Sequence, residues 1–92
     1  GEAYPRPIFS VRAAERLGTL GVLRRFPHAA AVWPFGEVVH YTDARPGMSN
    51  ASIITEVEAF ARAAGVEALE VRPIAAGIED AFMWHMMAQE RA

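Results

Sequence analysis

Three histidines are the side chains of this chain best suited to acid–base or metal chemistry near neutral pH. His28 follows a helix-ending proline, His40 lies at an outward position of a predicted strand, and His85 lies in the last predicted helix. No H-x-x-x-H or H-E-x-x-H spacing places two of them around one metal ion. Glu79 and Asp80 precede His85 by six and five residues, so neither carboxylate shares its helical face. We therefore interpret each histidine as a surface or partner-packed residue and expect no metal site.

Nucleophilic catalysis has little support in the residue types. The chain has no cysteine, which removes thiolate metal ligands and cysteine nucleophiles. No G-x-S-x-G nucleophile elbow is present, and Ser10, Ser49 and Ser52 fall in a predicted strand and at a predicted helix cap. All nine basic residues are arginine, so there is no lysine for a P-loop or a Schiff base. We expect no catalytic residues, no enzymatic activity and no cofactor in this chain.

The adjacent carboxylates Glu79 and Asp80 have the appearance of a catalytic acid pair. Both fall in the first turn of the last predicted helix. There negative charge meets the positive end of the helix dipole, which stabilises a helix by about 0.3–1 kcal/mol per charge. Arg24 and Arg25, at the end of the first predicted helix, are the mirror image of this arrangement. Neither pair needs a ligand, and we assign both a structural role.

Length and charge restrict the class of protein. A chain of 92 residues forms one domain with one modest core. Its net charge of −2 indicates no basic surface for nucleic acid. No apolar run approaches the ~18 residues of a membrane span. The absence of cysteine is compatible with a reducing cytoplasm. We expect a flexible N-terminal segment over residues 1–7 and a single α+β domain over residues 8–92.

Hydrophobic periodicity predicts seven elements that would position these side chains. Predicted strands cover 8–12, 29–33, 38–42 and 67–72, and predicted helices cover 13–25, 50–64 and 78–89. Gly36 indicates a hairpin turn, and Gly65 stands where a helix-ending glycine belongs. Ala13, Leu17 and Leu20 form the expected apolar stripe of the first helix, and Val22 or Leu23 extends it. The order predicts a ferredoxin-like split βαββαβ fold, an antiparallel sheet with two helices on one face, plus a C-terminal helix.

The last predicted helix is apolar around much of its circumference. Met83, Trp84 and Met87 lie in it, although an outer helix of a small domain normally keeps a polar face. Trp33 projects from its strand on the side opposite the expected core. Two interpretations of these four residues stay open. They form an exposed interface that meets a partner, or they belong to the core.

The segment V-R-P-I-A-A-G-I-E-D-A-F, residues 71–82, resembles the ending V-R-P-x-x-x-S-L-E-D-V-F of an extension that follows the ATPase core in many ABC exporter ATP-binding subunits. The residues that carry this likeness are Arg72, Pro73, Ile78, Glu79, Asp80 and Phe82. Upstream, R-R-F-P after the first helix, F-G in the hairpin and A-G-V after the second helix are also similar, so the likeness spans about residues 8–88. Gly77 and Ala81 depart from the serine and the larger aliphatic residue of the family, and residues 83–87 depart from its leucine-rich tail.

This resemblance implies a non-catalytic C-terminal accessory domain of an ABC transporter ATPase subunit of the exporter or multidrug type. The six residues of the motif would be structural. The P-loop, with ATP and Mg²⁺, would lie in an ATPase domain upstream. The implied partners are that ATPase domain and its dimer mate, the membrane permease subunit indirectly, and a second copy of the chain in a homodimer. The implied location is the inner face of the membrane.

An alternative from another class is an ACT-like small-molecule-sensing regulatory domain, which has the same order of elements. Such domains bind effectors at strand–helix loops, and the loop over residues 43–50, with Gly47, is the place for this here. Its composition is equally that of an ordinary turn. A third interpretation, a ferredoxin-like enzyme such as an acylphosphatase, needs a glycine-rich anion cradle before a helix. The sequence has none, and Asn50 is its sole asparagine.

Overall fold

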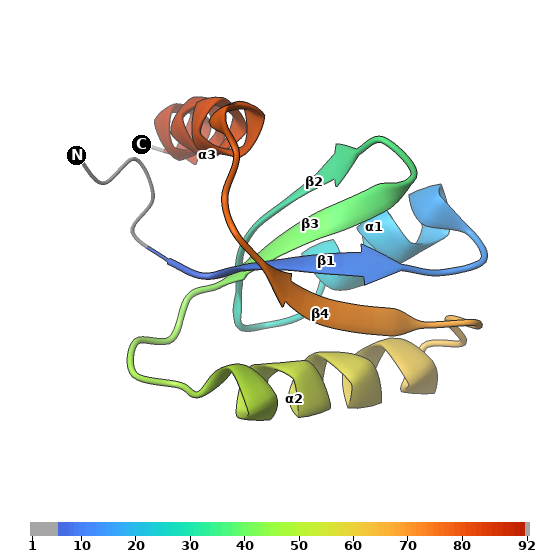
Figure 1. Cartoon of the computed structure of the whole chain (residues 1–92). Helices are drawn as coiled ribbons and strands as arrows, with labels where there is room; N and C mark the ends of the chain where they lie inside the picture. Colours follow the sequence, from blue (N-terminus) through green and yellow to red (C-terminus); the bar gives the residue numbers. More distant parts are fainter. Residues whose placement is uncertain (1–5, 92) are drawn as a thin grey trace.

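The computed structural model describes residues 6–91, apart from the side chains of residues 88, 90 and 91. Residues 6–91 form a four-stranded antiparallel sheet and three helices (Figure 1). In chain order the elements are β1 (Ile8–Arg12), α1 (Arg16–Arg24), β2 (Ala29–Phe35), β3 (Val38–Asp43), α2 (Asn50–Ala63), β4 (Glu70–Ile74) and α3 (Ile78–Arg91). The prediction of an α+β domain is thereby confirmed. None of the helices in this range is long and apolar enough to cross a membrane.

The strands lie side by side in the order β2-β3-β1-β4, and each neighbouring pair is antiparallel. β1 is paired on both sides, with Phe9 opposite Tyr41 of β3 and opposite Pro73 of β4. β2 and β4 are the edges, and each contains a proline, Pro34 and Pro73. Proline has no N–H to donate, so it is tolerated in a strand that is paired on one side only. This is why Pro73, one residue beyond the predicted strand 67–72, can lie inside β4.

The ends of α2 follow the chemistry that the sequence indicates. The Ser49 hydroxyl accepts a hydrogen bond from the Ser52 amide at 3.1 Å, which satisfies a donor that the first turn of the helix leaves unpaired. Gly65 follows the last turn with φ of 95°, a conformation that costs glycine little. The predicted start of this helix is confirmed, and its end lies one residue before the predicted one.

Two elements start at a different residue from the prediction. α1 begins at Arg16 and not at residue 13, because the Ala14 amide donates to the Glu67 carbonyl, 3.0 Å away, and stays outside the helix. β4 begins at Glu70 and not at residue 67, because Ala68 has φ of 54° and interrupts the extended backbone. The loop before β4 and the start of α1 are thus tied to each other.

The larger core lies between one face of the sheet and the helices α1 and α2. Strand alternation sends Phe9, Val11, Val39 and Tyr41 to this face. The buried helical residues are Val22 and Leu23 of α1 and Ile53, Val57 and Ala61 of α2. Each large apolar side chain buried in this way contributes about 1.5–3 kcal/mol. Leu17 is 65% exposed, so the predicted stripe of α1 is wrong at that position. Val22 and Leu23, expected as extensions of that stripe, are both buried in this core, and Leu20 packs against it.

A second, smaller core lies on the opposite face of the sheet. α3 lies on that side, away from α1 and α2 (Figure 1). Trp33 is fully buried there with Ile8 and Ala31. Met83, Trp84 and Met87 of α3 pack against this group and are half-buried. Of the two interpretations left open for these residues, the structure supports the core. A contact between any of them and a partner stays a prediction.

The segment before β1 contacts both the end of β3 and the helix α3. Residues 1–5 of the predicted flexible segment lie outside the described residues. Arg6, also in that segment, donates from Nη1 to the Asp43 carbonyl oxygen at 3.0 Å. Its guanidinium carbon lies 5.2 Å from the centre of the Trp84 ring, a distance suited to cation–π attraction. Arg6 therefore links the end of β3 to α3.

Candidate functional site

A buried polar cluster joins α3 to the hairpin of β2 and β3. The Asp80 carboxylate accepts a hydrogen bond from Trp33 Nε1 at 3.3 Å, and its Oδ1 lies 2.5 Å from His40 Nδ1. Its other oxygen accepts from the Gly77 amide at 3.0 Å. The His40 ring stacks on Phe35 with ring centres 4.3 Å apart. We call Trp33, His40 and Asp80 the buried triad.

The geometry of the buried triad suits structure better than catalysis. A histidine hydrogen-bonded to a carboxylate is the arrangement of many acid–base sites. Here, however, the side chains of His40 and Asp80 are only 4% and 3% exposed, so a dissolved substrate does not reach them. Three donors surround the carboxylate, which offsets the cost of removing its charge from water. The cluster can hold α3 in place.

Two expectations change at the buried triad. His40 was expected at the surface or packed against a partner, and it is instead buried within the chain because α3 covers the face on which it lies. Asp80 does occupy the first turn of the last helix, as predicted, and caps it through the Gly77 amide. Its links to Trp33 and His40 were not predicted. A hairpin turn at Gly36 places Trp33 opposite His40 on the neighbouring strand. The sequence therefore contained a signal that these two side chains lie together.

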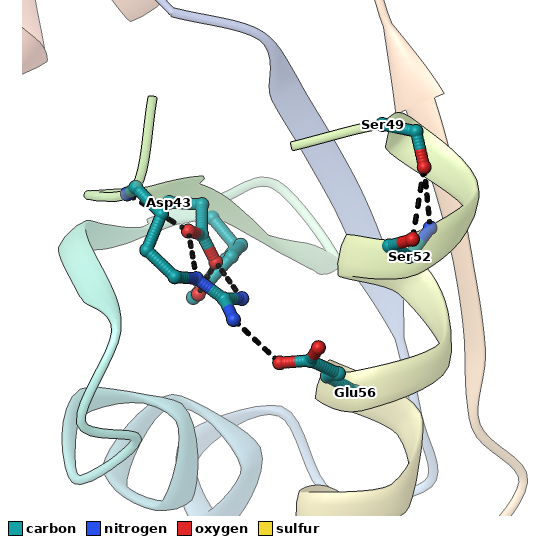
Figure 2. A network of polar contacts seen from close by, with 6 residues as sticks. Asp43, Ser49, Ser52 and Glu56 are labelled. Atoms are coloured by element: carbon teal, nitrogen blue, oxygen red, sulfur yellow. Dashed lines mark hydrogen bonds and ion pairs between the residues drawn. The ribbon is translucent and has the colours of Figure 1, made fainter. Parts of the chain in front are cut away.

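A second polar network surrounds Asp43 at the end of β3 (Figure 2). One carboxylate oxygen accepts from the Tyr41 hydroxyl at 2.6 Å. Arg45 reaches both oxygens, with Nε 2.8 Å from Oδ1 and Nη2 2.9 Å from Oδ2, and its amide donates to Oδ1 at 3.0 Å. The remaining nitrogen of Arg45, Nη1, lies 2.5 Å from Glu56 Oε1 on α2. This network fixes the loop after β3 to α2.

Burial and the contacts within this network shift the pKa values of Asp43, Tyr41 and Arg45. Burial by itself would raise the pKa of Asp43, but the hydrogen bonds from Arg45 and Tyr41 outweigh it, so that the pKa lies below its usual value. Burial, followed by the hydrogen bond to the Asp43 carboxylate, raises the pKa of Tyr41. Hydrogen bonds to Asp43 and Glu56 raise the pKa of Arg45. The folded chain therefore holds an ionised Asp43 and a neutral Tyr41 across a wide range of pH.

A cavity of about 460 Å³ lies beside the Asp43 network. It is lined by Arg6, Pro7, Asp43, Arg45, Pro46, Gly47, Met48 and Ile53. It thus includes most of the loop that the sequence indicated as a place for an effector. Two guanidinium groups and several apolar side chains line the same space. Such a mixture is typical of pockets for small molecules.

The motif residues of the last third lie on different sides of the molecule. Asp80 is buried, whereas Arg72, Pro73 and Glu79 are exposed. Ile78 is 85% exposed and Phe82 is 63% exposed, so both point away from the sheet that α3 covers. His28 is half-buried against Phe26, and His85 is exposed within reach of Gln89. Within residues 6–91, no group of three or more His, Asp or Glu side chains is placed to hold a metal ion.

Comparison of the chain with protein families, curated proteins and solved structures found no match.

Proposed function

We propose that this chain is a non-catalytic accessory domain of an ABC transporter ATPase subunit, which it serves by protein contact. In this proposal the sheet with α1 and α2 is a ferredoxin-like βαββαβ unit, and α3 is an addition that carries the contact surface. The support is the resemblance of residues 71–82 together with the way α3 is held.

The observation that carries the proposal is the division of the motif into an inward and an outward part. Asp80 faces inward and is bonded to two strands, whereas Ile78 and Phe82 face outward. Met86, 45% exposed, continues their line one turn further along. We call Ile78, Phe82 and Met86 the α3 ridge. A motif that served folding alone would not require large apolar side chains exposed to water. A docking helix requires inward residues that hold it and outward apolar residues that contact a partner.

The ATPase chemistry belongs to another part of the parent protein in this proposal. A P-loop requires a lysine, which this sequence does not contain. ATP and Mg²⁺ would bind to the ATPase domain upstream. The α3 ridge would contact that domain or its dimer mate on the cytoplasmic side, and the permease subunit would be reached indirectly. The domain would then act by stabilising the paired state of the two ATPase subunits.

A pair of matched substitutions in the parent protein tests the proposal. Phe82→Ser removes an exposed apolar side chain from the α3 ridge, and Leu17→Ser removes one of equal exposure from α1. We expect Phe82→Ser to weaken ATP-dependent dimerisation about tenfold or more, since a buried phenylalanine contributes about 1.5–3 kcal/mol to a contact. Leu17→Ser should leave dimerisation unchanged. Sedimentation and ATPase rates give the readout, and thermal melting should show that both variants fold.

Two results would count against the proposal. One is a parent reading frame without a G-x-x-x-x-G-K-[ST] sequence. The other is a dimerisation constant and an ATPase rate that are the same in Phe82→Ser, Leu17→Ser and the wild type.

A further inference from the structure

The cavity beside Asp43 has two cationic groups that are both oriented by the same residue. Arg6 donates from Nη1 to the backbone carbonyl of Asp43, and Arg45 holds its carboxylate through Nε and Nη2. Both arginines line the cavity. Their orientation is therefore set before any ligand arrives, which lowers the entropic cost of binding.

Neither guanidinium is fully satisfied by the interior of the protein. The Nε atom of Arg6 is buried without a hydrogen-bond partner. Nη1 of Arg45 is paired only with Glu56, whose side chain is 46% exposed. An exposed carboxylate on a helix surface is easily replaced, because an ion pair open to solvent contributes at most about 1 kcal/mol. Glu56 thus occupies a place that an external anion with the same chemistry can take.

Apart from the two arginines and Asp43, the side chains that line the cavity are apolar. Pro7 and Pro46 line it together with Met48 and Ile53. The Asp43 carboxylate offers nothing to a ligand, since Tyr41 and Arg45 already use both of its oxygens. The cavity accordingly presents positive donors at one part and hydrocarbon at another. A phosphate ion uses only the first of these, whereas a carboxylate with a short aliphatic body uses both.

We propose that this cavity is a binding site for a small aliphatic carboxylate, held between Arg6 and Arg45 with its hydrocarbon part against Met48 and Ile53. Glu56 is its internal competitor. The Arg6 guanidinium also lies over the Trp84 ring. Binding of a ligand to Arg6 therefore changes the surroundings of Trp84 on α3. This proposal does not depend on the transporter function. It gives the domain a means of responding to a metabolite, whatever its parent protein.

Titration of the 92-residue chain with 3-methylbutanoate at constant ionic strength tests the proposal. Calorimetry gives the dissociation constant, and the two indole N–H signals give an internal control in NMR spectra. We expect saturable binding with a Kd of about 1 mM, as is typical of so small a ligand. The Trp84 indole signal should shift with ligand, whereas that of Trp33, which is bonded to Asp80, should not.

Three substitutions are expected to change the dissociation constant in different ways. Arg6→Gln should weaken binding about tenfold, since it removes a charged hydrogen-bond donor. Glu56→Ala should tighten binding several-fold, because it removes the competitor. Glu58→Ala is the matched control, because Glu58 lies on the same helix but pairs with Arg62. It should leave the Kd unchanged. Thermal melting confirms that each variant is folded.

Further ligands decide the chemistry. 3-Methylbutanol, which has the same body without the charge, should not bind, and inorganic phosphate should bind more weakly than the carboxylate. The proposal is overturned if no ligand saturates the chain at about twenty times the expected Kd. It is also overturned if phosphate binds as tightly as the carboxylate, or if Arg6→Gln and Glu56→Ala bind with the wild-type Kd.

Discussion

His40 Nδ1 and Asp80 Oδ1 lie 2.5 Å apart, although the two residues are separated by 40 positions in the sequence. The contact joins β3, an inner strand of the sheet, to α3, which also packs on the small core of Ile8, Ala31 and Trp33 and lies against Arg6. Because the pair is buried, its loss leaves polar groups without partners in a place that water does not reach.

Asp80→Ala should therefore destabilise the chain by about 3 kcal/mol, because it leaves Trp33 and His40 buried without their partner, at about 1–3 kcal/mol for each unsatisfied group. The substitution removes the acceptor of Trp33, His40 and the Gly77 amide together. Urea unfolding followed by tryptophan fluorescence measures the effect. Glu79→Ala, one residue earlier and exposed, is the control and should change the free energy of unfolding by less than about 0.5 kcal/mol. Equal effects of the two substitutions would contradict the role assigned to the buried triad.

Acid stability should depend on Asp43. Its pKa is lower in the folded chain than in the unfolded chain, so the unfolded state takes up a proton first as the pH falls. The stabilisation is complete above the usual value of 3.8 and is lost as the pH falls from there through the lowered folded value. Arg45→Gln removes the main cause of the shift. Urea midpoints between about pH 2 and pH 7 should then fall less steeply on the acid side than in the wild type. An unchanged acid slope would argue against this assignment.

The environment of Tyr41 predicts that the free energy of unfolding decreases at alkaline pH. Its pKa is raised in the folded chain, so above the usual value of 10.0 the unfolded state ionises while the folded state does not. Stability present below pH 10 is therefore lost as the pH rises beyond it. Tyr41→Phe should cost about 1 kcal/mol at pH 7 through the lost hydrogen bond, yet remove the alkaline decline due to this group. Chemical unfolding at several values from about pH 8 to pH 11 distinguishes the two effects.

The cap of α2 gives a prediction that is independent of charge. Ser49→Ala removes the acceptor of the Ser52 amide and should lower the free energy of unfolding by about 1 kcal/mol. Ser52→Ala keeps that backbone contact and should cost less than about 0.5 kcal/mol. Thermal unfolding of both variants is sufficient. A larger loss in Ser52→Ala than in Ser49→Ala would show that the cap lies elsewhere.

Local chemistry was enough to predict the elements of the fold. Apolar alternation identifies β1 and β3, Gly36 marks the hairpin, and Ser49 and Gly65 bound α2, because each of these signals acts within a few residues. Such signals fix which residues share a face of a strand. They do not fix which face each helix covers.

Which residues meet in the buried triad and in the Asp43 network depends on the face that each helix covers. The sequence indicates that His40 and Trp33 share one side of the hairpin, but not that α3 returns to cover it. Asp80 was therefore assigned to its own helix only. Likewise, the loop after β3 was recognised as a place for a ligand, whereas the approach of Arg6 and Glu56 to its ends was not. Contacts between residues far apart in sequence decide both sites.

The prolines of β2 and β4 have a consequence for how this domain meets other molecules. Both outer margins of the sheet are interrupted by a residue that cannot donate to a neighbouring backbone. An incoming strand would leave one of its carbonyl groups without a donor at that point, so growth of the sheet by addition of chains is disfavoured. Stable association must then use side chains rather than main-chain pairing. Conditions that promote fibrils in other small sheet proteins should leave this one dispersed.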